Sequence, residues 1–361
     1  MPVTQPRITG VGSHLPPALV TNEELCGTFN RWARGEDPDA PESSPAFIDQ
    51  VSGIRARHFW DASGILDLSR MAPRIPDRAD EELSVQAELG LAAAQRAIAD
   101  AGVDPAEIDL VIVGASSLQR PYPSIAIEIQ AALGARGFAF DCSVGCSSGA
   151  YAIQLANDAI AMGRARSALV CVPELPSAYA NFRDRDSHFI LGDAGAAVVV
   201  QAADAATKPG GLTILDASLV SRYSNNVRNN CGFLNRCDEA HRDDADKLFY
   251  QEGRRVFRDI VKLVPSVIEE QLARHRLTPS DVTTFWLHQA NARLNGAIGE
   301  RLVGPRAADK FPMVLETTAN TAAAGALLAL DMHRALDSGQ IGVLCAFGAG
   351  YTVGSLLLQA A

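Results

Sequence analysis

Short apolar runs alternate along the chain with longer stretches of helical periodicity. Residues 139–142 predict a short buried strand, and the apolar residues that follow recur at helical spacing until Gly163. The longest helical pattern covers residues 248–275 and contains Pro265, which predicts a kink or a break in that helix. This alternation predicts an α/β protein in which mostly parallel strands are covered by helices on both faces.

An internal repeat divides the chain into two similar halves. At an offset of 174 positions, residues 103–116 align with 277–290, and residues 167–173 align with 341–347. The last strand of each half also matches, at an offset of 158, so the first half carries about sixteen extra residues near 179–190. Several matches in the same order at one offset indicate a duplicated structural unit.

The duplication has a geometric consequence for three polar residues. The two predicted domains, residues 1–205 and 206–361, are expected to be related by a pseudo-twofold axis that brings equivalent helix starts face to face. At the offset of 174, Cys146 of the first half falls on Asn320 of the second. His288 ends the strand "TTFWLH", and open α/β sheets bind ligands at the carboxyl ends of their strands. A Cys, a His and an Asn can thus meet from distant parts of the sequence.

Cys146 stands in a small-residue turn between the predicted strand and the predicted helix. Backbone N–H groups and the helix dipole favour an anion there, which predicts a lowered thiol pKa. The same N–H groups can stabilise a developing oxyanion. A buried cysteine is more often a packing residue, His288 could be a core histidine, and Asn320 could be a helix N-cap. The repeat favours the functional interpretation of all three residues.

Several segments resemble the signature blocks of the thiolase superfamily, namely "FDCSVGCSSGAYA", "WLHQANARL", "ETTANTAAAG" and "FGAGYTVGSLLL". The resemblance is to β-ketoacyl-acyl carrier protein (ACP) synthase III, and it covers nearly the whole chain. It implies a thiolase-like fold, with two pseudo-repeated mixed-sheet halves in an αβαβα layered arrangement. The segments "LDLSRMAPRIPDRADEE", "RPYPSIAIEIQAALG" and "NFRDRDSHFILGD" resemble a subgroup that takes medium-chain acyl-CoA primers to make β-ketodecanoyl-ACP.

The resemblance implies a decarboxylative Claisen condensation. Cys146 would be acylated by the primer, while His288 and Asn320 would hold the malonyl-ACP thioester carbonyl as carbon dioxide leaves. Two neutral donors suit that task, because negative charge develops on the thioester oxygen. An oxyanion hole would come from the amides of Cys146 and Ala349. The family usually has Gly at position 349, and Ala is tolerable there if its φ is negative.

The resemblance also implies where the substrates and the second subunit lie. Arg185 and Arg293 match positions that contact the coenzyme A (CoA) nucleotide or the carrier surface, and arginine suits phosphate because its planar donors pair bidentately. Phe47 stands where the family commonly stacks a Trp on adenine, and Val51 where it commonly has an Arg. Tyr122 would line the acyl tunnel of the other subunit of a homodimer. The polar segment 31–44 either compensates for Val51 or forms a mobile flap.

Composition restricts the partners and the compartment. A net charge of −10 disfavours nucleic acid, although an acidic carrier protein could dock on a local basic patch such as Arg164 and Arg166. No apolar run reaches about 18 residues, so we expect no membrane span. Seven cysteines and the absence of an apolar signal region indicate a reducing, cytoplasmic location. We expect no metal, because Cys142 and Cys146 have no second Cys/His pair nearby, and no cofactor besides the two thioester substrates.

Three classes of function fit these patterns. The first is condensation of an acyl-CoA with malonyl-ACP, and the second is transfer of the acyl group from Cys146 to another acceptor in secondary metabolism. Asn320 favours condensation, since simple acyl transfer does not need a second enolate donor. The third class, a non-catalytic partner subunit, is disfavoured by the intact Cys, His and Asn. Thiolase-type cleavage needs a second Cys in the final Gly-rich block, which "FGAGYTVGS" lacks.

Overall fold

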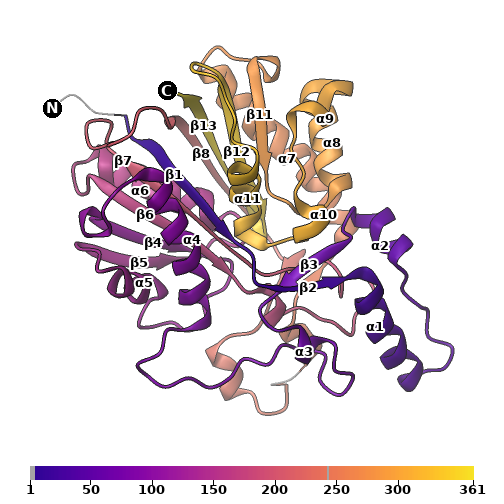
Figure 1. Ribbon diagram of the computed structural model, residues 1–361. Helices are drawn as coiled ribbons and strands as arrows, with labels where there is room; N and C mark the ends of the chain where they lie inside the picture. The colour runs from indigo at the N-terminus through magenta and orange to yellow at the C-terminus, as the bar shows by residue number, and fades with distance from the viewer. Residues whose placement is uncertain (1–4, 242–243) are drawn as a thin grey trace.

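The computed structural model describes residues 5–241 and 244–361. A mixed sheet of nine strands runs through the molecule (Figure 1). Its order is β11 (Val282–Leu287), β12 (Ile341–Gly348), β13 (Gly350–Ala360), β8 (Leu212–Ser224), β1 (Arg7–His14), β7 (Ala194–Gln201), β6 (Ser167–Glu174), β4 (Leu110–Gly114) and β5 (Phe138–Cys142).

The strands of this sheet are mostly antiparallel, so the prediction of mostly parallel strands is wrong. Among the described strands, β4 is parallel to β5 and β6, and β11 is parallel to β12. The pairs β6–β7, β12–β13, β13–β8 and β1–β7 are antiparallel. The reason is connectivity. No helix long enough to form a crossover lies between β6 and β7 or between β12 and β13 in the described chain, and a parallel pair needs such a crossover.

Three helical layers alternate with the two halves of the sheet, and the short pairing of β1 with β8 joins these halves. The first outer layer contains α4 (Val85–Ala101) and α5 (Ile125–Leu133). The central layer contains α6 (Ser148–Ala161) and α11 (Gly325–Met332), and the second outer layer contains α7 (Gly253–Arg274) and α8 (Ala292–Val303). Ile153 of α6 and Leu327 of α11 share one core with β6 and β7 from the first half and β12 and β13 from the second. The predicted αβαβα layering is confirmed.

The repeat is visible in the element boundaries. β6 and β12 begin and end 174 positions apart, and α6 corresponds to a 3₁₀ turn, η7 (Ala322–Ala324), that leads into α11. The two central helices therefore start at equivalent places, Cys146 just before α6 and Asn320 just before η7. The predicted domain boundary at 205/206 falls between β7 and β8, and it stays a prediction.

Two elements differ from their sequence predictions. β5 is the edge strand of the sheet, and its residues are partly exposed rather than buried. α7 begins at Gly253 and passes through Pro265 without a break. Proline removes one intrahelical hydrogen bond, but Leu263, Val264 and Ile268 on its buried face pack into the second outer core and hold the helix together.

The remaining elements lie at the ends and edges of these layers. They are β2 (Ala18–Thr21), α1 (Asn22–Glu36), α2 (Pro45–Ser52), β3 (Ala56–Phe59), α3 (Ala62–Ile65), β9 (Val227–Arg228), β10 (Tyr250–Gln251), α9 (Ala307–Lys310), α10 (Leu315–Thr318) and the 3₁₀ turns η1 (Pro105–Glu107), η2 (Pro176–Ala178), η3 (Phe233–Cys237), η4 (Ala245–Lys247), η5 (Pro279–Asp281) and η6 (Gly304–Arg306).

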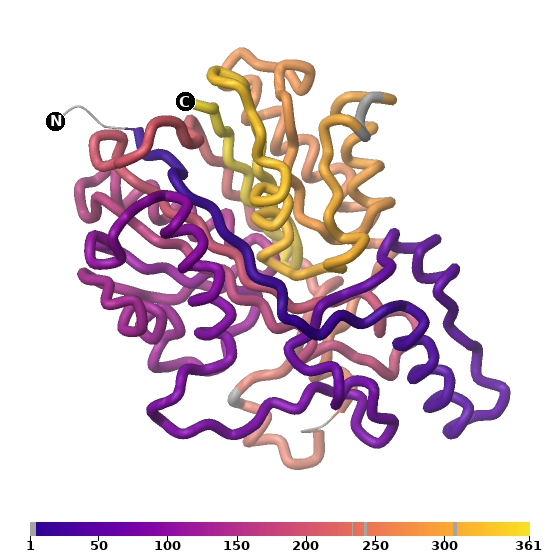
Figure 2. The backbone as a smooth tube through the Cα atoms, viewed as in Figure 1, coloured from indigo at the N-terminus to yellow at the C-terminus, as the bar shows by residue number. Residues whose placement is uncertain are grey.

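The N-terminal segment crosses from one half to the other. Figure 2 shows the indigo trace running along the boundary of the halves and then packing beside the C-terminal half. There the backbone N–H of Arg55 donates to the carbonyl of Glu316 over 2.8 Å. Residues 31–36 of the polar segment extend α1, whose first turn is closed by a capping box between Thr21 and Glu24. No helix in the described part of the chain is long and apolar enough to cross a membrane.

Candidate active site

Cys146 lies in the tight turn between β5 and α6. Gly145 before it has φ +58°, a conformation that favours glycine. The backbone N–H groups of Cys146 and Ala349 both act on the Cys146 thiol and lower its pKa. The described residues with positive φ do not include Ala349, so the alanine at this position is free of the strain that a positive φ would bring. The structure thus brings both predicted oxyanion-hole amides to the sulfur.

The pKa of the Cys146 thiol is raised, contrary to the sequence prediction. Burial, and to a smaller extent the charge of Glu174, raises this pKa to about 12, although the N–H groups of Cys146 and Ala349 act in the opposite direction. The turn supplies the expected donors, but desolvation of the charged form is the larger effect. In the free protein the sulfur is therefore a thiol at neutral pH.

His288 directly follows β11 and is almost completely buried. Its backbone N–H donates to the carbonyl of Cys345 over 2.8 Å, and its ring meets Phe347 edge to face with 5.3 Å between ring centroids. Burial lowers the pKa of His288 to about 4, against which a hydrogen bond to the backbone of Ala322 acts. The imidazole is therefore neutral at physiological pH, and a neutral imidazole can donate one hydrogen bond through its protonated ring nitrogen.

Asn320 is held in a loop that α10 and η7 enclose. Its N–H donates to the carbonyl of Ile190 over 3.0 Å, and its own carbonyl accepts from Gly192 over 3.1 Å. Its side-chain Oδ1 accepts from the N–H of Ala322 over 3.0 Å. This bond resembles the predicted capping role, and it leaves the amide NH₂ group of Asn320 available to donate to a ligand.

These contacts bring Cys146, His288 and Asn320 to one site. Gly348, the residue after Phe347, lies so close to Cys146 that a Cβ there would be 3.1 Å from Sγ. The backbone of Ala322 is shared by the side chains of His288 and Asn320. The arrangement offers two neutral donors opposite a nucleophile with two amides of its own. Chemically, it can form a thioester at sulfur and stabilise an enolate beside it.

A pair of hydroxyl groups connects the backbone segments that carry the two amides. Ser147 Oγ and Thr352 Oγ1 are 2.9 Å apart, and Ser147 Oγ also lies 3.1 Å from the carbonyl of Thr352. Thr352 Oγ1 donates toward the carbonyls of Val144 and Ala349, each over 3.1 Å. Sequence reasoning missed this Ser147–Thr352 latch, because neither residue belongs to a motif that by itself indicates chemistry.

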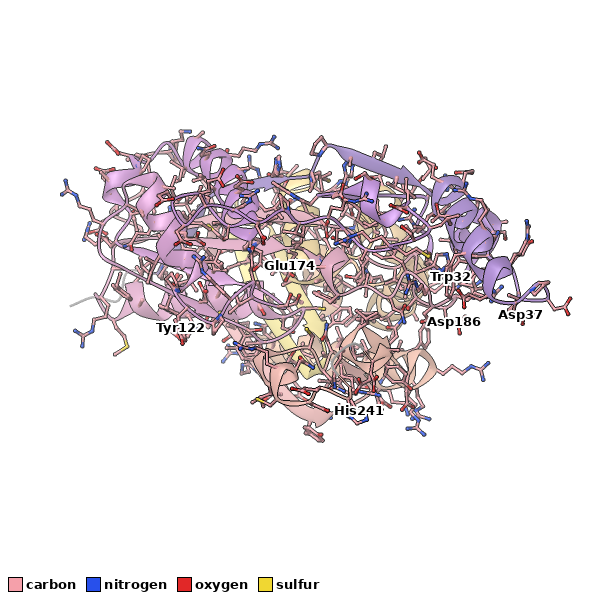
Figure 3. All side chains as sticks on the ribbon, turned by 90° about the horizontal axis from the view of Figure 1, so that it is seen from below. Trp32, Asp37, Tyr122, Glu174, Asp186 and His241 are labelled. Carbon is pink, nitrogen blue, oxygen red and sulfur yellow. The ribbon has the colours of Figure 1, made fainter. Side chains whose placement is uncertain are left out.

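Glu174 is a second residue that sequence reasoning missed. It ends β6, is completely buried, and lies near the middle of the molecule in Figure 3. Its carboxyl accepts hydrogen bonds from both the N–H and the hydroxyl of Ser116, each over 2.6 Å. A charged residue at the end of the apolar run "SALVCVP" was the available signal, since charged residues are seldom fully buried without partners.

The structure brings together two of the predicted CoA- or carrier-binding residues. The guanidinium of Arg185 lies 4.4 Å from the ring centroid of Phe47 on α2, and its Nε donates to the carbonyl of Glu42. Arg293 is exposed near the start of α8, beside the end of α2, where Asn291 Nδ2 donates to the carbonyl of Val51 over 2.9 Å. These residues surround one surface region at α2.

Tyr122 lies apart from that region. Its side chain is 81% exposed in the single chain, and Figure 3 places it at the opposite side of the molecule from Trp32 and Asp186, with Glu174 between them. Within one chain, the structure does not bring Tyr122 into contact with Cys146, His288 or Asn320.

Two family models match the chain. Residues 140–222 match 3-oxoacyl-[acyl-carrier-protein (ACP)] synthase III, and residues 272–360 match the C-terminal part of the same family. The β-ketodecanoyl-[acyl-carrier-protein] synthase of Pseudomonas aeruginosa is 48% identical over 329 residues, covering 91% of this chain and 94% of that protein. The β-ketoacyl-[acyl-carrier-protein] synthase III of Acidiphilium cryptum is 32% identical over 356 residues, covering 98% of each.

Solved structures of similar proteins have the same fold. The 3-oxoacyl-(acyl carrier protein) synthase III of Pseudomonas aeruginosa superposes with a TM-score of 0.79 at 26% identity, covering 98% of both chains. The priming β-ketosynthase of the R1128 polyketide pathway superposes with a TM-score of 0.79 at 29% identity, covering 98% of this chain and 96% of that one.

Proposed function

Because the chain belongs to the β-ketoacyl-[acyl-carrier-protein] synthase III family of condensing enzymes, we propose that it condenses a medium-chain acyl-CoA with malonyl-ACP. The observation that carries the proposal is the meeting of Cys146, with two amides at its sulfur, and the neutral donors His288 and Asn320. The proposed product is a β-ketoacyl-ACP, and no metal or resident cofactor takes part.

In the first half-reaction, Cys146 takes the acyl group from the primer. The sulfur attacks the thioester carbonyl, whose oxygen accepts from the N–H groups of Cys146 and Ala349 as it becomes negative. The C–S bond to CoA then breaks, and CoA leaves as a thiol that carries the proton from Cys146. One thiol is consumed and another is released. This half-reaction therefore involves no net loss of a proton, even though the pKa of Cys146 is raised.

In the second half-reaction, malonyl-ACP replaces CoA. Its carboxylate leaves as carbon dioxide, and the electron pair of the broken C–C bond forms an enolate whose oxygen accepts from His288 and Asn320. The enolate carbon attacks the acyl carbonyl on Cys146, the C–S bond breaks, and the sulfur regains a proton from solvent. Donors that bind the enolate more tightly than the ground-state carbonyl lower the barrier of the decarboxylation.

The proposed primer has about eight carbons, because the relative that is 48% identical is a β-ketodecanoyl-[acyl-carrier-protein] synthase and condensation adds two carbons. Each methylene buried in an apolar tunnel contributes about 0.8 kcal/mol. An octanoyl group would therefore bind more tightly than acetyl by several kcal/mol if the tunnel accommodates it. The region of Phe47, Arg185 and Arg293 is proposed to hold the CoA nucleotide, with the Phe47 ring in the stacking position.

The carrier protein is proposed to dock on the N-terminal part of α7 rather than at Arg164 and Arg166. Those two arginines follow the far end of α6, a helix of 14 residues that extends about 20 Å away from Cys146. The N-terminal part of α7 instead borders a surface cleft that includes Asp259 and Tyr351, two residues from Ala349. The exposed cations on this part of α7 are Arg254, Arg255, Arg258 and Lys262.

A homodimer is the proposed assembly, with β5 of two chains side by side. β5 is the sheet edge, and edge strands are commonly paired or covered. The neighbouring surface exposes apolar side chains, namely Tyr122, Ile127, Phe138, Leu155 and Met162. In such a dimer the Tyr122 of one chain would reach the acyl tunnel of the other. Seven free cysteines support a reducing, cytoplasmic location.

Acylation of Cys146 is tested by mixing the protein with single acyl-CoAs of increasing length and measuring its intact mass. We expect rapid addition of an octanoyl group and peptide mapping that places it on Cys146. The Cys142→Ala variant serves as the matched control and should be acylated normally. Acylation of Cys142, or of no cysteine, would contradict the proposal. Acetyl-CoA winning a direct competition against octanoyl-CoA would assign the protein to the short-primer class instead.

The roles of the two donors are tested by separating the half-reactions. His288→Ala and Asn320→Ala should still be acylated by octanoyl-CoA, but malonyl-ACP decarboxylation should fall about 10²–10³-fold for each donor removed. Equal loss of both half-reactions in both variants would show that the donors are wrongly assigned.

A further inference from the structure

Glu174 is a buried carboxyl group that the proposed chemistry does not use. Besides its two bonds from Ser116, its Oε1 accepts from the N–H of Ala323 over 3.2 Å. Ser116 Oγ in turn lies 2.9 Å from the hydroxyl of Tyr179. The carboxyl thus connects the loop after β4, in the first half of the molecule, with η7, which follows Asn320 in the second half.

The loop that Glu174 holds is strained. Ala319 and Ala322, on either side of Asn320, have φ values of +55° and +46°. A non-glycine residue in such a conformation is strained and keeps it only where surrounding contacts impose it. The hydrogen bond from the Ala323 N–H to Glu174 is one of those contacts. It fixes the residue next to Ala322, whose own N–H donates to Asn320 Oδ1.

The pseudo-twofold relation gives Glu174 a counterpart at the nucleophile. At the offset of 174, Glu174 corresponds to Gly348, and each residue ends the equivalent strand, β6 or β12. Gly348 lies against Cys146, close enough that a Cβ would be 2.7 Å from Cys146 Cβ. Glu174 lies in the equivalent place against the loop of Asn320, where its longer side chain accepts from the N–H of Ala323, whereas Gly348 contacts the turn of Cys146 directly.

We propose that Glu174 is a positioning residue for the condensation step, which holds Asn320 in register with His288 through Ala323 and Ser116 and opposes the thiolate of Cys146 when it ionises. The proposal rests on the proposed function of Cys146, His288 and Asn320. Glu174 touches none of the reacting atoms, so its effect is on geometry and on charge. Other oxygen acceptors at the same place can supply the geometry, whereas only a carboxylate supplies the charge.

The charged state of Glu174 is disfavoured by its surroundings. Burial raises the pKa of Glu174 to about 8, and the nearby Asp193 carboxyl also raises it, whereas the bonds from Ser116 and Ala323 lower it. The other titratable groups near Glu174 are the Cys146 thiol and the Tyr179 hydroxyl, whose pKa values its charge raises. When Glu174 is protonated, it can donate to Ser116 Oγ, and Ser116 can donate to Tyr179, so both states keep their hydrogen bonds.

Substitution by glutamine or alanine separates geometry from charge. A glutamine at 174 retains Oε1 as acceptor for Ser116 and Ala323, and its NH₂ group can donate to Ser116 Oγ, but it cannot ionise. An alanine removes every one of these bonds. Asp109→Asn is the matched control, because Asp109 accepts from the N–H groups of Arg166 and Ser167 at the opposite end of β6.

The experiment measures the two half-reactions separately in the full-length protein, with octanoyl-CoA for acylation and malonyl-ACP for decarboxylation. In Glu174→Ala, decarboxylation should fall about 10²-fold, the effect expected when a catalytic group is misplaced by about 1 Å, while acylation of Cys146 is largely retained. Glu174→Gln should decarboxylate at nearly the wild-type rate. Its Cys146 should also react with iodoacetamide with a pH midpoint below that of the wild type, as followed by peptide mapping.

Several results would overturn the inference. They are a wild-type decarboxylation rate in Glu174→Ala, an equal loss of both half-reactions in that variant, a Glu174→Gln variant as impaired as Glu174→Ala, or an unchanged alkylation midpoint. If Glu174→Ala does not fold, Glu174→Asp replaces it, because its shorter side chain cannot span Ser116 and Ala323. A wild-type protein that performs neither half-reaction refutes the proposed function itself, whereas the alkylation midpoint tests the charge of Glu174 without any substrate.

Discussion

At the residue scale, the space around Cys146 is set by glycine. A Cβ at position 348 would lie 2.7 Å from Cys146 Cβ, a distance that real side chains essentially never show, and 3.2 Å from the Cys146 nitrogen, which is a tight contact. Any side chain there must displace the sulfur or the amide that is proposed to supply one donor of the oxyanion hole. The neighbouring position 349 is different, because its role requires only a backbone N–H and its side chain is tolerated as alanine.

We therefore predict opposite results for substitutions at these adjacent positions. Gly348→Ala should reduce acylation of Cys146 by octanoyl-CoA about 10²-fold or more, as expected for loss of one oxyanion donor. Ala349→Gly is the matched control and should retain the rate. Both rates are measured by intact mass after rapid quenching. Normal acylation of Gly348→Ala would mean that the turn has room to relax and that the close approach is not required.

At the element scale, the site depends on how the β5–α6 turn is joined to the β12–β13 turn. The Ser147–Thr352 latch makes this connection, with Thr352 Oγ1 contacting carbonyls on both turns. Main-chain bonds within each strand pair hold each turn separately, but they do not fix the distance between the two N–H groups. The latch therefore acts on the proposed oxyanion hole, whereas the contacts of Glu174 act on the loop of Asn320.

Thr352→Val should impair acylation more than decarboxylation. Valine has nearly the shape of threonine, but it removes the hydroxyl that donates toward the carbonyls of Val144 and Ala349, while Ser147 Oγ keeps the carbonyls of Ala346 and Thr352 as partners. Losing a hydrogen bond of this kind costs about 0.5–1.5 kcal/mol. We expect acylation to slow while the rate of malonyl-ACP decarboxylation changes little. Thr352→Ser, which restores the hydroxyl, should recover the acylation rate. Failure of serine to recover it would assign the loss to packing of the methyl group.

At the scale of the whole molecule, β5 leaves one edge of the nine-stranded sheet without a partner. Phe138 at the start of β5 is 46% exposed, and apolar residues of α5 and α6 lie on the same part of the surface. An exposed apolar patch beside an open edge is typical of an interface between copies. The proposed acyl tunnel is completed only in that assembly, because Tyr122 lies on this face.

We predict that Phe138→Asp shifts the protein from dimer to monomer in sedimentation velocity, because two like charges would meet across paired edges. Phe257→Asp is the matched control, since Phe257 is 41% exposed on α7, in a different layer, and its variant should remain dimeric. The Phe138→Asp variant should also lose its preference for octanoyl-CoA over acetyl-CoA. A wild-type protein that sediments as a monomer would exclude this assembly.

The sequence by itself determined the duplicated α/β architecture and the candidate chemistry. Helical and strand periodicities are local, and the offset of 174 needs only the order of residues along the chain, so Cys146 and Asn320 could be placed opposite each other before any contact was known. His288 was identified as a candidate site residue from its position at the end of a strand. Their catalytic roles stay proposals until the half-reactions are measured.

Only the tertiary structure decided the properties that depend on burial and on neighbours from distant segments. It placed β5 at an edge and made most strand pairs antiparallel, which periodicity cannot distinguish. It reversed the predicted direction of the Cys146 pKa, because desolvation arises from segments that are distant in sequence, such as Gly348, whereas the sequence shows only the adjacent turn. It also buried Glu174 between two halves that are far apart in sequence, where a single carboxyl can act on a loop 149 residues away.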